Sequence, residues 1–265
     1  MSKFIVFEGV DKSGKTTQIM RAEEWLKELD YNVIRLVEPG YTKLGFELRR
    51  LLKTNSIPCC KEAQKYIFMA ARAQLITEEL KPALVDNNDK KTVVLCDRYA
   101  LSTLCYQEMP SVLESDLAKD GFPPNPNYLR YQCYERYRSE FTKFCAKLGF
   151  ITGTETIMGG GGSWQVEKIR MPDLNIVFDL DFETWKERSL ASVETPDRFE
   201  SQEEYIKQVI ENYRYTCQYT DQLELNEGNR VIYHTFGHCV KIDATEPKDI
   251  VMFDVRQAIL NTLNH

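Results

Sequence analysis

Residues 9–16, with the sequence GVDKSGKT, constrain this chain more than any other stretch. They match the pattern G-x-x-x-x-G-K-[ST], in which glycines let the backbone curl so that successive N–H groups point at phosphate oxygens. An apolar run at residues 4–7 precedes the pattern, and apolar residues at helical spacing follow it from residue 16 to 29. A strand, a glycine loop and a helix in this order predict a P-loop, the binding site of a nucleoside triphosphate.

Each residue type in the loop has a chemical reason. Lys15 is expected to reach the β- and γ-phosphates, and the hydroxyl of Thr16 is expected to ligate Mg²⁺. The start of the helix adds the positive end of its dipole. From this loop, the predicted ATP-binding residues are Gly9, Lys12, Ser13, Gly14, Lys15, Thr16 and Thr17.

The composition excludes several classes of protein. A net charge of −6 over 265 residues argues against DNA or RNA as the main partner. The eight cysteines contain no C-x-x-C pair, which disfavours a zinc or redox motif and favours reduced thiols. The first strand begins at once, leaving no room for a signal peptide, and no apolar run approaches about 18 residues. We therefore expect a soluble intracellular protein, in the cytoplasm or the nucleus, with no membrane partner.

Strand-like and helix-like segments alternate along most of the chain. Strands are predicted at residues 4–7, 33–37, 92–96, 174–180 and 240–243. Helices are predicted at residues 16–29, 44–53, 61–85 and 247–263. This alternation predicts an α/β fold in which five parallel strands lie between two layers of helices.

Residues 108–171 do not fit the alternation, and we interpret them as an insertion. A helix is predicted at residues 128–150, with Tyr128, Tyr131, Tyr134 and Tyr137 forming a packing surface. The run of four glycines at residues 159–162 predicts a mobile loop.

Seven short motifs, taken together in order, resemble those of thymidylate kinases. They cover nearly the whole chain outside the insertion, and a series in the right order is far more specific than any single motif. The motifs are FEGVDKSGKTT at 7–17, EPGYT at 38–42 with Gly45 and Arg49, FMAARAQ at 68–74, DRYALSTLCYQ at 97–107, PDL at 172–174, DRFE at 197–200 and IDAT at 242–245.

The resemblance implies a single domain over residues 1–265 that transfers the γ-phosphate of ATP to dTMP, giving dTDP and ADP with Mg²⁺. It also implies a homodimer and a lid over ATP at residues 188–200. The implied metal ligands are Thr16 and Asp97, and the implied catalytic residues are Lys12, Lys15, Asp97 and Arg98. On the donor side, Arg188 and Arg198 bracket the lid, and Ala244 and Thr245 are expected to border the adenine.

For the acceptor, the resemblance assigns roles residue by residue. Asp11 would accept a hydrogen bond from the sugar 3′-OH, Phe68 would stack on the base, and Arg72 would donate to the base carbonyl edge. Arg98 and Arg49 would bind the acceptor phosphate, and Tyr106 would crowd the sugar 2′ position. The complete expected acceptor set is Asp11, Glu38, Pro39, Arg49, Phe68, Arg72, Arg98, Ser102, Thr103, Tyr106 and Gln107.

Three departures from the family pattern leave the acceptor open. Tyr41 stands at a glycine position, Val37 replaces an arginine, and Ala71 replaces the acidic or amide residue before Arg72. The insertion also begins next to Gln107, so dUMP or a modified pyrimidine such as 5-hydroxymethyl-dUMP is an alternative acceptor. Two other classes also fit a P-loop. A regulator without turnover is disfavoured by the complete set of site residues, and a GTPase by the lack of an N-K-x-D motif.

Overall fold

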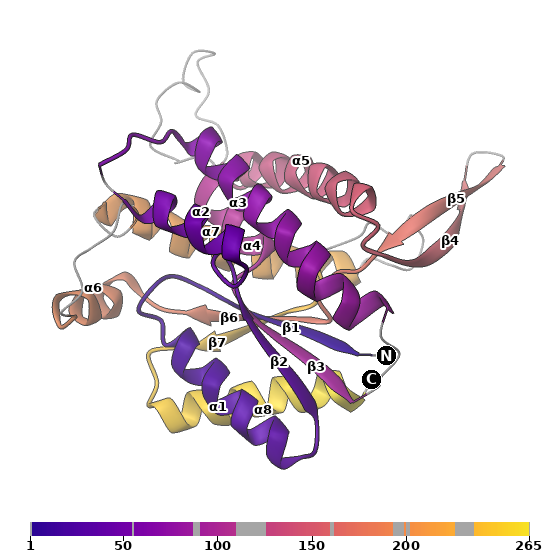
Figure 1. The fold of residues 1–265 in the computed structure, drawn as a ribbon. Helices are drawn as coiled ribbons and strands as arrows, with labels where there is room; N and C mark the ends of the chain where they lie inside the picture. The colour runs from indigo at the N-terminus through magenta and orange to yellow at the C-terminus, as the bar shows by residue number, and fades with distance from the viewer. Residues whose placement is uncertain are drawn as a thin grey trace.

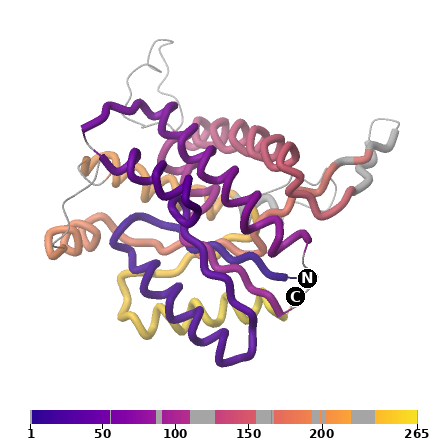
Figure 2. Tube along the Cα trace, viewed as in Figure 1, coloured from indigo at the N-terminus to yellow at the C-terminus, as the bar shows by residue number. Residues whose placement is uncertain are grey.

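The computed structural model describes residues 2–54, 56–86, 91–109, 126–159, 162–192, 199, 202–225 and 236–264. Helices cover both faces of one central sheet, and a separate two-stranded hairpin projects from this body (Figures 1 and 2). The strands of the central sheet are β1 (Lys3–Glu8), β2 (Asn32–Val37), β3 (Thr92–Asp97), β6 (Leu174–Asp179) and β7 (Cys239–Asp243).

The central sheet is entirely parallel, with the strand order β2-β3-β1-β6-β7. Strand β1 occupies the middle, and Phe4, Ile5, Val6 and Phe7 have no exposed surface. A strand covered on both faces needs apolar residues at successive positions, which explains the uninterrupted run in the sequence. All five predicted strands are confirmed, each within one residue of its expected ends.

Two layers of helices enclose the sheet (Figure 1). Helices α1 (Lys15–Glu28) and α8 (Lys248–Asn264) cover one face, and α3 (Lys61–Leu75), α5 (Pro126–Lys147) and α7 (Glu203–Leu225) lie over the other. The three-layer α/β/α arrangement expected from the alternation is thus confirmed. None of the helices in the described ranges is long and apolar enough to cross a bilayer.

Helix α2 (Lys43–Lys53) begins at a side-chain cap. The hydroxyl of Thr42 accepts a hydrogen bond from the N–H of Gly45 at 3.0 Å, which satisfies one of the free donors of the first turn. Arg49 and Lys53 are four residues apart in α2, so their side chains lie on the same face of this helix.

The single helix predicted at residues 61–85 is wrong in its second half. Regular α-helix ends at Leu75, and the chain continues through the wider turns η1 (Ile76–Leu80) and η2 (Pro82–Asp86). Pro82 has no N–H to donate and its ring crowds the preceding turn, so a regular α-helical ladder cannot run through it.

The insertion contains a hairpin that the sequence analysis missed. Strands β4 (Ile151–Gly159) and β5 (Gly162–Ile169) pair antiparallel, and Gly159 pairs with Gly162. The prediction of a mobile loop at residues 159–162 is therefore wrong for the two outer glycines, and residues 160 and 161 lie outside the described ranges. Thr152, Thr154 and Thr156 alternate along β4, and such β-branched residues favour a pleated strand.

The tyrosine row on α5 is partly a packing surface. Tyr134 and Tyr137 are fully buried and pack against Phe236, with ring centroids 5.3 and 5.5 Å away. Tyr131, one turn earlier, is partly exposed but packs edge-on against Tyr219, with ring centroids 5.5 Å apart, and Tyr128, two turns earlier, is exposed. The packing prediction is confirmed for Tyr131, Tyr134 and Tyr137 and wrong for Tyr128.

Helices α6 (Phe182–Leu190) and α7 were not predicted, and neither was the short helix α4 (Ala100–Thr103) after β3. Helix α6 begins at Asp181, whose carboxylate accepts from the N–H of Thr184 at 2.9 Å. Helix α7 follows the proposed lid, of which residues 193–198 and 200 lie outside the described ranges. Both helices carry apolar residues at helical spacing, for example Ile206, Val209, Ile210 and Tyr213, all buried.

Candidate active site

The loop between β1 and α1 has the backbone that a phosphate-binding loop requires. Gly9 adopts φ 134°, and a Cβ at this position would lie 2.8 Å from the carbonyl oxygen of Phe178. Gly14 caps α1 with φ 89°. L-residues rarely adopt these conformations, so both glycines of the motif are explained by geometry.

Lys15 is buried at the start of α1. Its ammonium donates to the carbonyl oxygen of Val10 at 2.7 Å and to the hydroxyl of Ser13 at 3.4 Å. Burial and the nearby Arg98 guanidinium lower the pKa of Lys15 to about 8, despite the opposing charges of Asp11 and Asp97. The lysine is thus held inside the loop, and the nearby carboxylates do not fully offset the effect of burial on its charge. The phosphates of a nucleotide would add the negative charge that stabilises the ammonium form.

Thr16 and Asp97 meet at the carboxyl end of β3. The threonine hydroxyl donates to the Asp97 carboxylate at 3.0 Å. Hydroxyl and carboxylate oxygens are the ligands that Mg²⁺ prefers, and a magnesium site in a kinase is completed by water and phosphate oxygens. The described residues contain no group of three or more His, Cys, Asp or Glu side chains that would hold a metal without such help.

Arg98 connects the end of β3 to the P-loop. Its backbone is left-handed (φ 70°), and its guanidinium donates to the carbonyl oxygen of Gly9 at 2.9 Å and to Asp11 at 2.7 Å. Burial works against the charge of Arg98, but the Asp11 carboxylate holds the pKa of the guanidinium above its ordinary value. In return, although burial opposes ionisation, Arg98 and Lys15 lower the pKa of Asp11. Both groups of this pair are charged.

Glu8, to which the sequence analysis assigned no role, holds the turn that carries Arg98. Its carboxylate is fully buried and accepts from the N–H of Tyr99 at 2.8 Å and from the hydroxyl of Ser102 at 2.6 Å. The hydroxyl of Tyr213 on α7 donates to the same carboxylate at 3.0 Å. A buried acid at the end of a predicted strand was the available signal.

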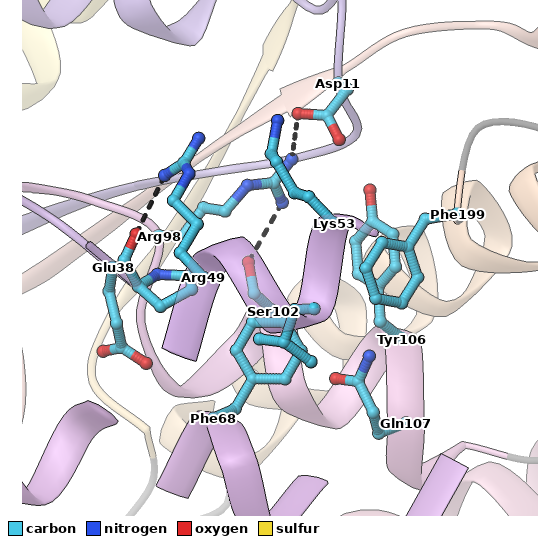
Figure 3. A pocket seen from close by; sticks show the side chains of 12 residues that line it. Asp11, Glu38, Arg49, Lys53, Phe68, Arg98, Ser102, Tyr106, Gln107 and Phe199 are labelled. Atoms are coloured by element: carbon cyan, nitrogen blue, oxygen red, sulfur yellow. Dashed lines mark hydrogen bonds and ion pairs between the residues drawn. The ribbon is translucent and has the colours of Figure 1, made fainter. Parts of the chain in front are cut away.

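A pocket opens directly beside this part of the P-loop (Figure 3). It contains about 550 Å³ of empty space, part of it open to solvent. The residues that line it come from the P-loop, the turn after β2, helices α2 and α3, the segment after β3 and the end of the proposed lid. They are Asp11, Glu38, Pro39, Arg49, Leu52, Lys53, Phe68, Arg98, Ser102, Tyr106, Gln107 and Phe199.

The pocket has two chemically different ends. Figure 3 shows Asp11 and the charged tips of Lys53 and Arg98 at one end, and Phe68 and Gln107 at the other. Phe199 completes an aromatic wall, with ring centroids 6.4 Å from Phe68 and 6.0 Å from Tyr106. A charged end and an aromatic end match an anion joined to a flat ring.

Lys53 and Phe199 line the pocket, although neither was predicted as a site residue from the sequence. Lys53 follows Arg49 by four positions on α2, and this spacing was a usable signal. Phe199 lies in the DRFE motif, which we had assigned only to the lid.

Gln107 presents two buried polar atoms to the pocket. Neither its amide nitrogen nor its amide oxygen has a hydrogen-bond partner in the described part of the chain. Unpaired buried polar atoms are costly, so at a pocket they indicate groups that a ligand satisfies.

Arg72 does not line the pocket, in contrast to the expected contact with a base. Its side chain is fully buried and forms a two-pronged ion pair with Glu38. The remaining guanidinium N–H groups have further acceptors. These are the hydroxyl of Tyr137 at 2.8 Å, the carbonyl oxygen of Tyr99 at 3.0 Å, the hydroxyl of Thr103 at 2.9 Å and the sulfur of Met69 at 3.5 Å. Thr103 is likewise buried and absent from the lining.

The donor-side residues are brought together only in part. Arg188 on α6 donates to the carbonyl oxygens of Ala244 at 2.8 Å and Lys12 at 3.3 Å. The ammonium of Lys12 donates to the hydroxyl of Ser192 at 3.1 Å. Thr245 bonds to Asp243, and Thr17 is exposed in the first turn of α1. Arg198 lies outside the described ranges.

Comparison with known proteins agrees with this geometry. A family model described as thymidylate kinase matches residues 7–133. The thymidylate kinase of Trichormus variabilis is 43% identical over 117 residues, which are 43% of this chain and 54% of that protein. That of Caldicellulosiruptor saccharolyticus is 44% identical over 105 residues, 40% of this chain and 49% of that protein. The aligned segments thus span about half the length of these two relatives.

A third relative aligns along most of the chain. The thymidylate kinase of Finegoldia magna is 27% identical over 241 residues, which are 90% of this chain and 96% of that protein. The segment matched by the family model includes the P-loop, α2, α3 and the turn after β3, and these elements build the pocket. The motif order, the fold, the pocket and these comparisons together support the resemblance of this chain to the thymidylate kinases.

Proposed function

We propose that this protein transfers the γ-phosphoryl group of ATP to dTMP, giving dTDP and ADP, and so acts in the synthesis of dTTP. The observation that carries the proposal is the pocket beside the P-loop, which shares Asp11 with that loop. Its charged end faces the site of the donor phosphates and its aromatic end lies away from it. A nucleoside monophosphate bound with its phosphate at the charged end is therefore directed at the γ-phosphate.

The proposed step needs little covalent help from the protein. An oxygen of the dTMP phosphate attacks the γ-phosphorus, and the bond between that phosphorus and the bridging oxygen of ADP breaks. The acceptor phosphate is largely a dianion at neutral pH, because its second pKa is about 6. No general base is required, so positioning and charge neutralisation carry the reaction.

Arg98, Arg49 and Lys53 supply positive charge for the acceptor phosphate. Arg98 is held by Gly9 and Asp11, and Arg49 donates to the carbonyl oxygen of Pro39 at 2.8 Å. Lys53 provides a cation on the same face of α2, which offsets the loss of the arginine that Val37 replaces. Charge-assisted hydrogen bonds to phosphate are roughly twice as strong as neutral ones.

Phe68, Tyr106 and Phe199 supply the surface for the base, and Gln107 supplies its hydrogen bonds. The buried amide offers one donor and one acceptor side by side. These match the N3–H and O4 of thymine. The carboxylate of Asp11, with 41% of its side chain exposed, is available to the sugar 3′-OH.

Thr16 and Asp97 would hold Mg²⁺, which when bound neutralises charge on the donor phosphates. Their oxygen atoms lie 3.0 Å apart at the mouth of the loop, which supports this assignment. Lys15, one residue before Thr16, would contact the same phosphates. Lys12 and Arg188 would add charge from the other side of the loop.

We also propose that the protein is a homodimer, as the family resemblance implies. Exposed large apolar side chains, including Phe46 and Tyr66, lie on the neighbouring helices α2 and α3 and support an interface there. Light scattering on the purified protein tests this proposal, and a mass equal to one chain rejects it.

The test of the activity is an acceptor panel. Purified protein is incubated with Mg-ATP and dTMP, dUMP, 5-hydroxymethyl-dUMP or dGMP, and ADP formation is followed. We expect acceptor-dependent ADP with dTMP as the best of these four. ADP formation that does not depend on any monophosphate would reject the kinase proposal and favour a regulator, and a preference for a modified base would replace dTMP as acceptor.

A further inference from the structure

Gln107 is the polar group that remains uncommitted at the aromatic end of the pocket. It lies in the turn η3 (Leu104–Glu108) and lines the pocket next to Tyr106. Neither its amide nitrogen nor its amide oxygen has a partner in the described ranges of the chain. Since both atoms are buried, whatever binds at this end must satisfy a donor and an acceptor together.

Arg72, by contrast, is not available to read a base. Its N–H groups are taken up by Glu38, Tyr137, Tyr99, Thr103 and Met69, and its side chain is fully buried. An arginine at the base edge can only donate hydrogen bonds. It would therefore bind a base that has a carbonyl group at this edge and disfavour a base that has an amino group there. No arginine among the described residues that line the aromatic end of the pocket therefore discriminates between a carbonyl and an amino group on the base.

The other polar atoms near the base end are committed or distant. The hydroxyl of Ser102 donates to Glu8 at 2.6 Å and lies 2.9 Å from that of Tyr213, and Glu38 is occupied by Arg72. The hydroxyl of Tyr106 lies at the far end of its ring from Gln107, toward Asp11 (Figure 3). Among the described residues that line the pocket, reading of the base edge therefore depends on Gln107.

A carboxamide can read two kinds of pyrimidine edge. Thymine and uracil present the N3–H donor beside the O4 acceptor, whereas cytosine presents the N3 acceptor beside the amino donor. Rotating the Gln107 amide by about 180° exchanges its oxygen and NH₂ group, and this terminal torsion has no strong preference. No protein hydrogen bond in the described ranges fixes the Gln107 amide in one of these two orientations, because neither its nitrogen nor its oxygen has a partner there.

We propose that the pocket takes cytosine as well as thymine, so that dCMP is a second phosphoryl acceptor. The inference rests on the proposed function and widens its substrate class to deoxypyrimidine monophosphates. A site built to hydrogen-bond only one edge rejects the wrong partner by about 10⁴-fold or more. A reorienting amide keeps two hydrogen bonds with either base, so kcat/KM for dCMP should lie within about tenfold of that for dTMP.

The test compares dTMP and dCMP as acceptors for the full chain with saturating Mg-ATP, by ADP release and by chromatographic detection of dTDP and dCDP. Gln107→Leu removes both amide atoms at similar volume. It should lower kcat/KM for the two acceptors by the same factor, about tenfold or more. Gln257→Leu, at an exposed position of α8, is the matched control and should leave both values unchanged.

The outcomes separate this inference from the proposed function. Phosphorylation of dTMP with dCMP lower by about 10⁴-fold overturns the inference and leaves the thymidylate kinase activity intact. Phosphorylation of neither substrate means that the proposed function itself fails. Equal losses in Gln107→Leu support the inference, whereas a variant that keeps dCMP activity shows that another group reads the base. The wild-type ratio decides the question even if the variant does not fold.

Discussion

Arg98 and Asp11 form an ion pair of 2.7 Å that joins the end of β3 to the P-loop. The two residues are 87 positions apart in sequence, yet both line the pocket beside the P-loop. In the proposed reaction, the pair would set the position of the acceptor phosphate relative to the donor phosphates. Because Asp11 belongs to the P-loop, the proposed donor and acceptor sites share a wall.

Lys15→Ala should abolish turnover. The ammonium lies inside the loop, where it would neutralise the β- and γ-phosphates, and losing such a charge costs about 10²–10³ in kcat or more. Steady-state ADP formation with dTMP measures this effect. Lys27→Ala, near the other end of α1 and paired with Glu23 on the surface, is the control and should retain full activity. Normal turnover in Lys15→Ala would contradict the loop assignment.

The affinity for ATP should fall above pH 8. The charged form of Lys15 binds phosphate, and burial lowers the pKa of this lysine to about 8. Below pH 8 the ammonium is already present, so the Kd stays constant. Above pH 8 binding must take up a proton, and the Kd for ATP should rise by up to about tenfold per pH unit.

Isothermal titration with ATP between pH 7 and 9.5 checks this dependence. Lys15→Arg is the control, since a guanidinium stays charged throughout this range and its Kd should not vary with pH. A wild-type Kd that is flat to pH 9.5 would show that Lys15 does not titrate there.

Lys12→Ala should lower kcat by about 10²-fold while changing the Kd for ATP less than about threefold. Lys12 stands at a left-handed position of the loop (φ 65°) with its ammonium near Ser192, at the edge of the donor site. Charge that acts on the transferring group affects the transition state more than the bound nucleotide. Lys168→Ala, on the exposed side of β5, is the control. An unchanged kcat would remove the catalytic role of Lys12.

Lys53→Met should raise the KM for dTMP by about tenfold or more and leave the KM for ATP unchanged. The variant keeps the apolar stem but loses a charge-assisted contact to the acceptor phosphate, worth about 1.5–3 kcal/mol. Arg50→Met is the matched control on α2, because its side chain is 78% exposed and pairs with Glu47. Equal KM values for dTMP in the two variants would exclude Lys53 from the site.

Arg72→Met should destabilise the fold by about 3–5 kcal/mol, because it leaves the buried Glu38 carboxylate without its partner. Urea unfolding followed by circular dichroism measures the loss. Adding Glu38→Gln should recover part of it. Lys91→Met breaks the exposed pair with Asp30 and should leave the midpoint of urea unfolding nearly unchanged. If Arg72→Met keeps wild-type stability but has a raised KM for dTMP, Arg72 contacts the base and is not mainly a structural residue.

Local patterns accounted for most of the central body. The run at residues 4–7 had to be buried on both faces, and the glycines of the P-loop had to adopt positive φ, so strand, loop and helix were readable in order. The hairpin β4–β5 was not predicted because the four consecutive glycines suggested a loop, although alternating threonines precede them in β4. Helix α7 was missed although its apolar spacing was present.

The P-loop, the parallel sheet and the order of the nucleotide-kinase motifs could be predicted from the sequence alone, because they depend on spacing and backbone conformation within short stretches. Which side chains face the pocket depends instead on packing between elements that are distant in sequence. Arg72 and Gln107 both stand in motifs, but burial beside Glu38 and Tyr137 commits the arginine to the protein, whereas the glutamine amide is left for a ligand. Lys53 and Phe199 entered the pocket for the same reason: α2 and the segment before α7 are brought together by folding, over a distance in sequence that no local pattern encodes.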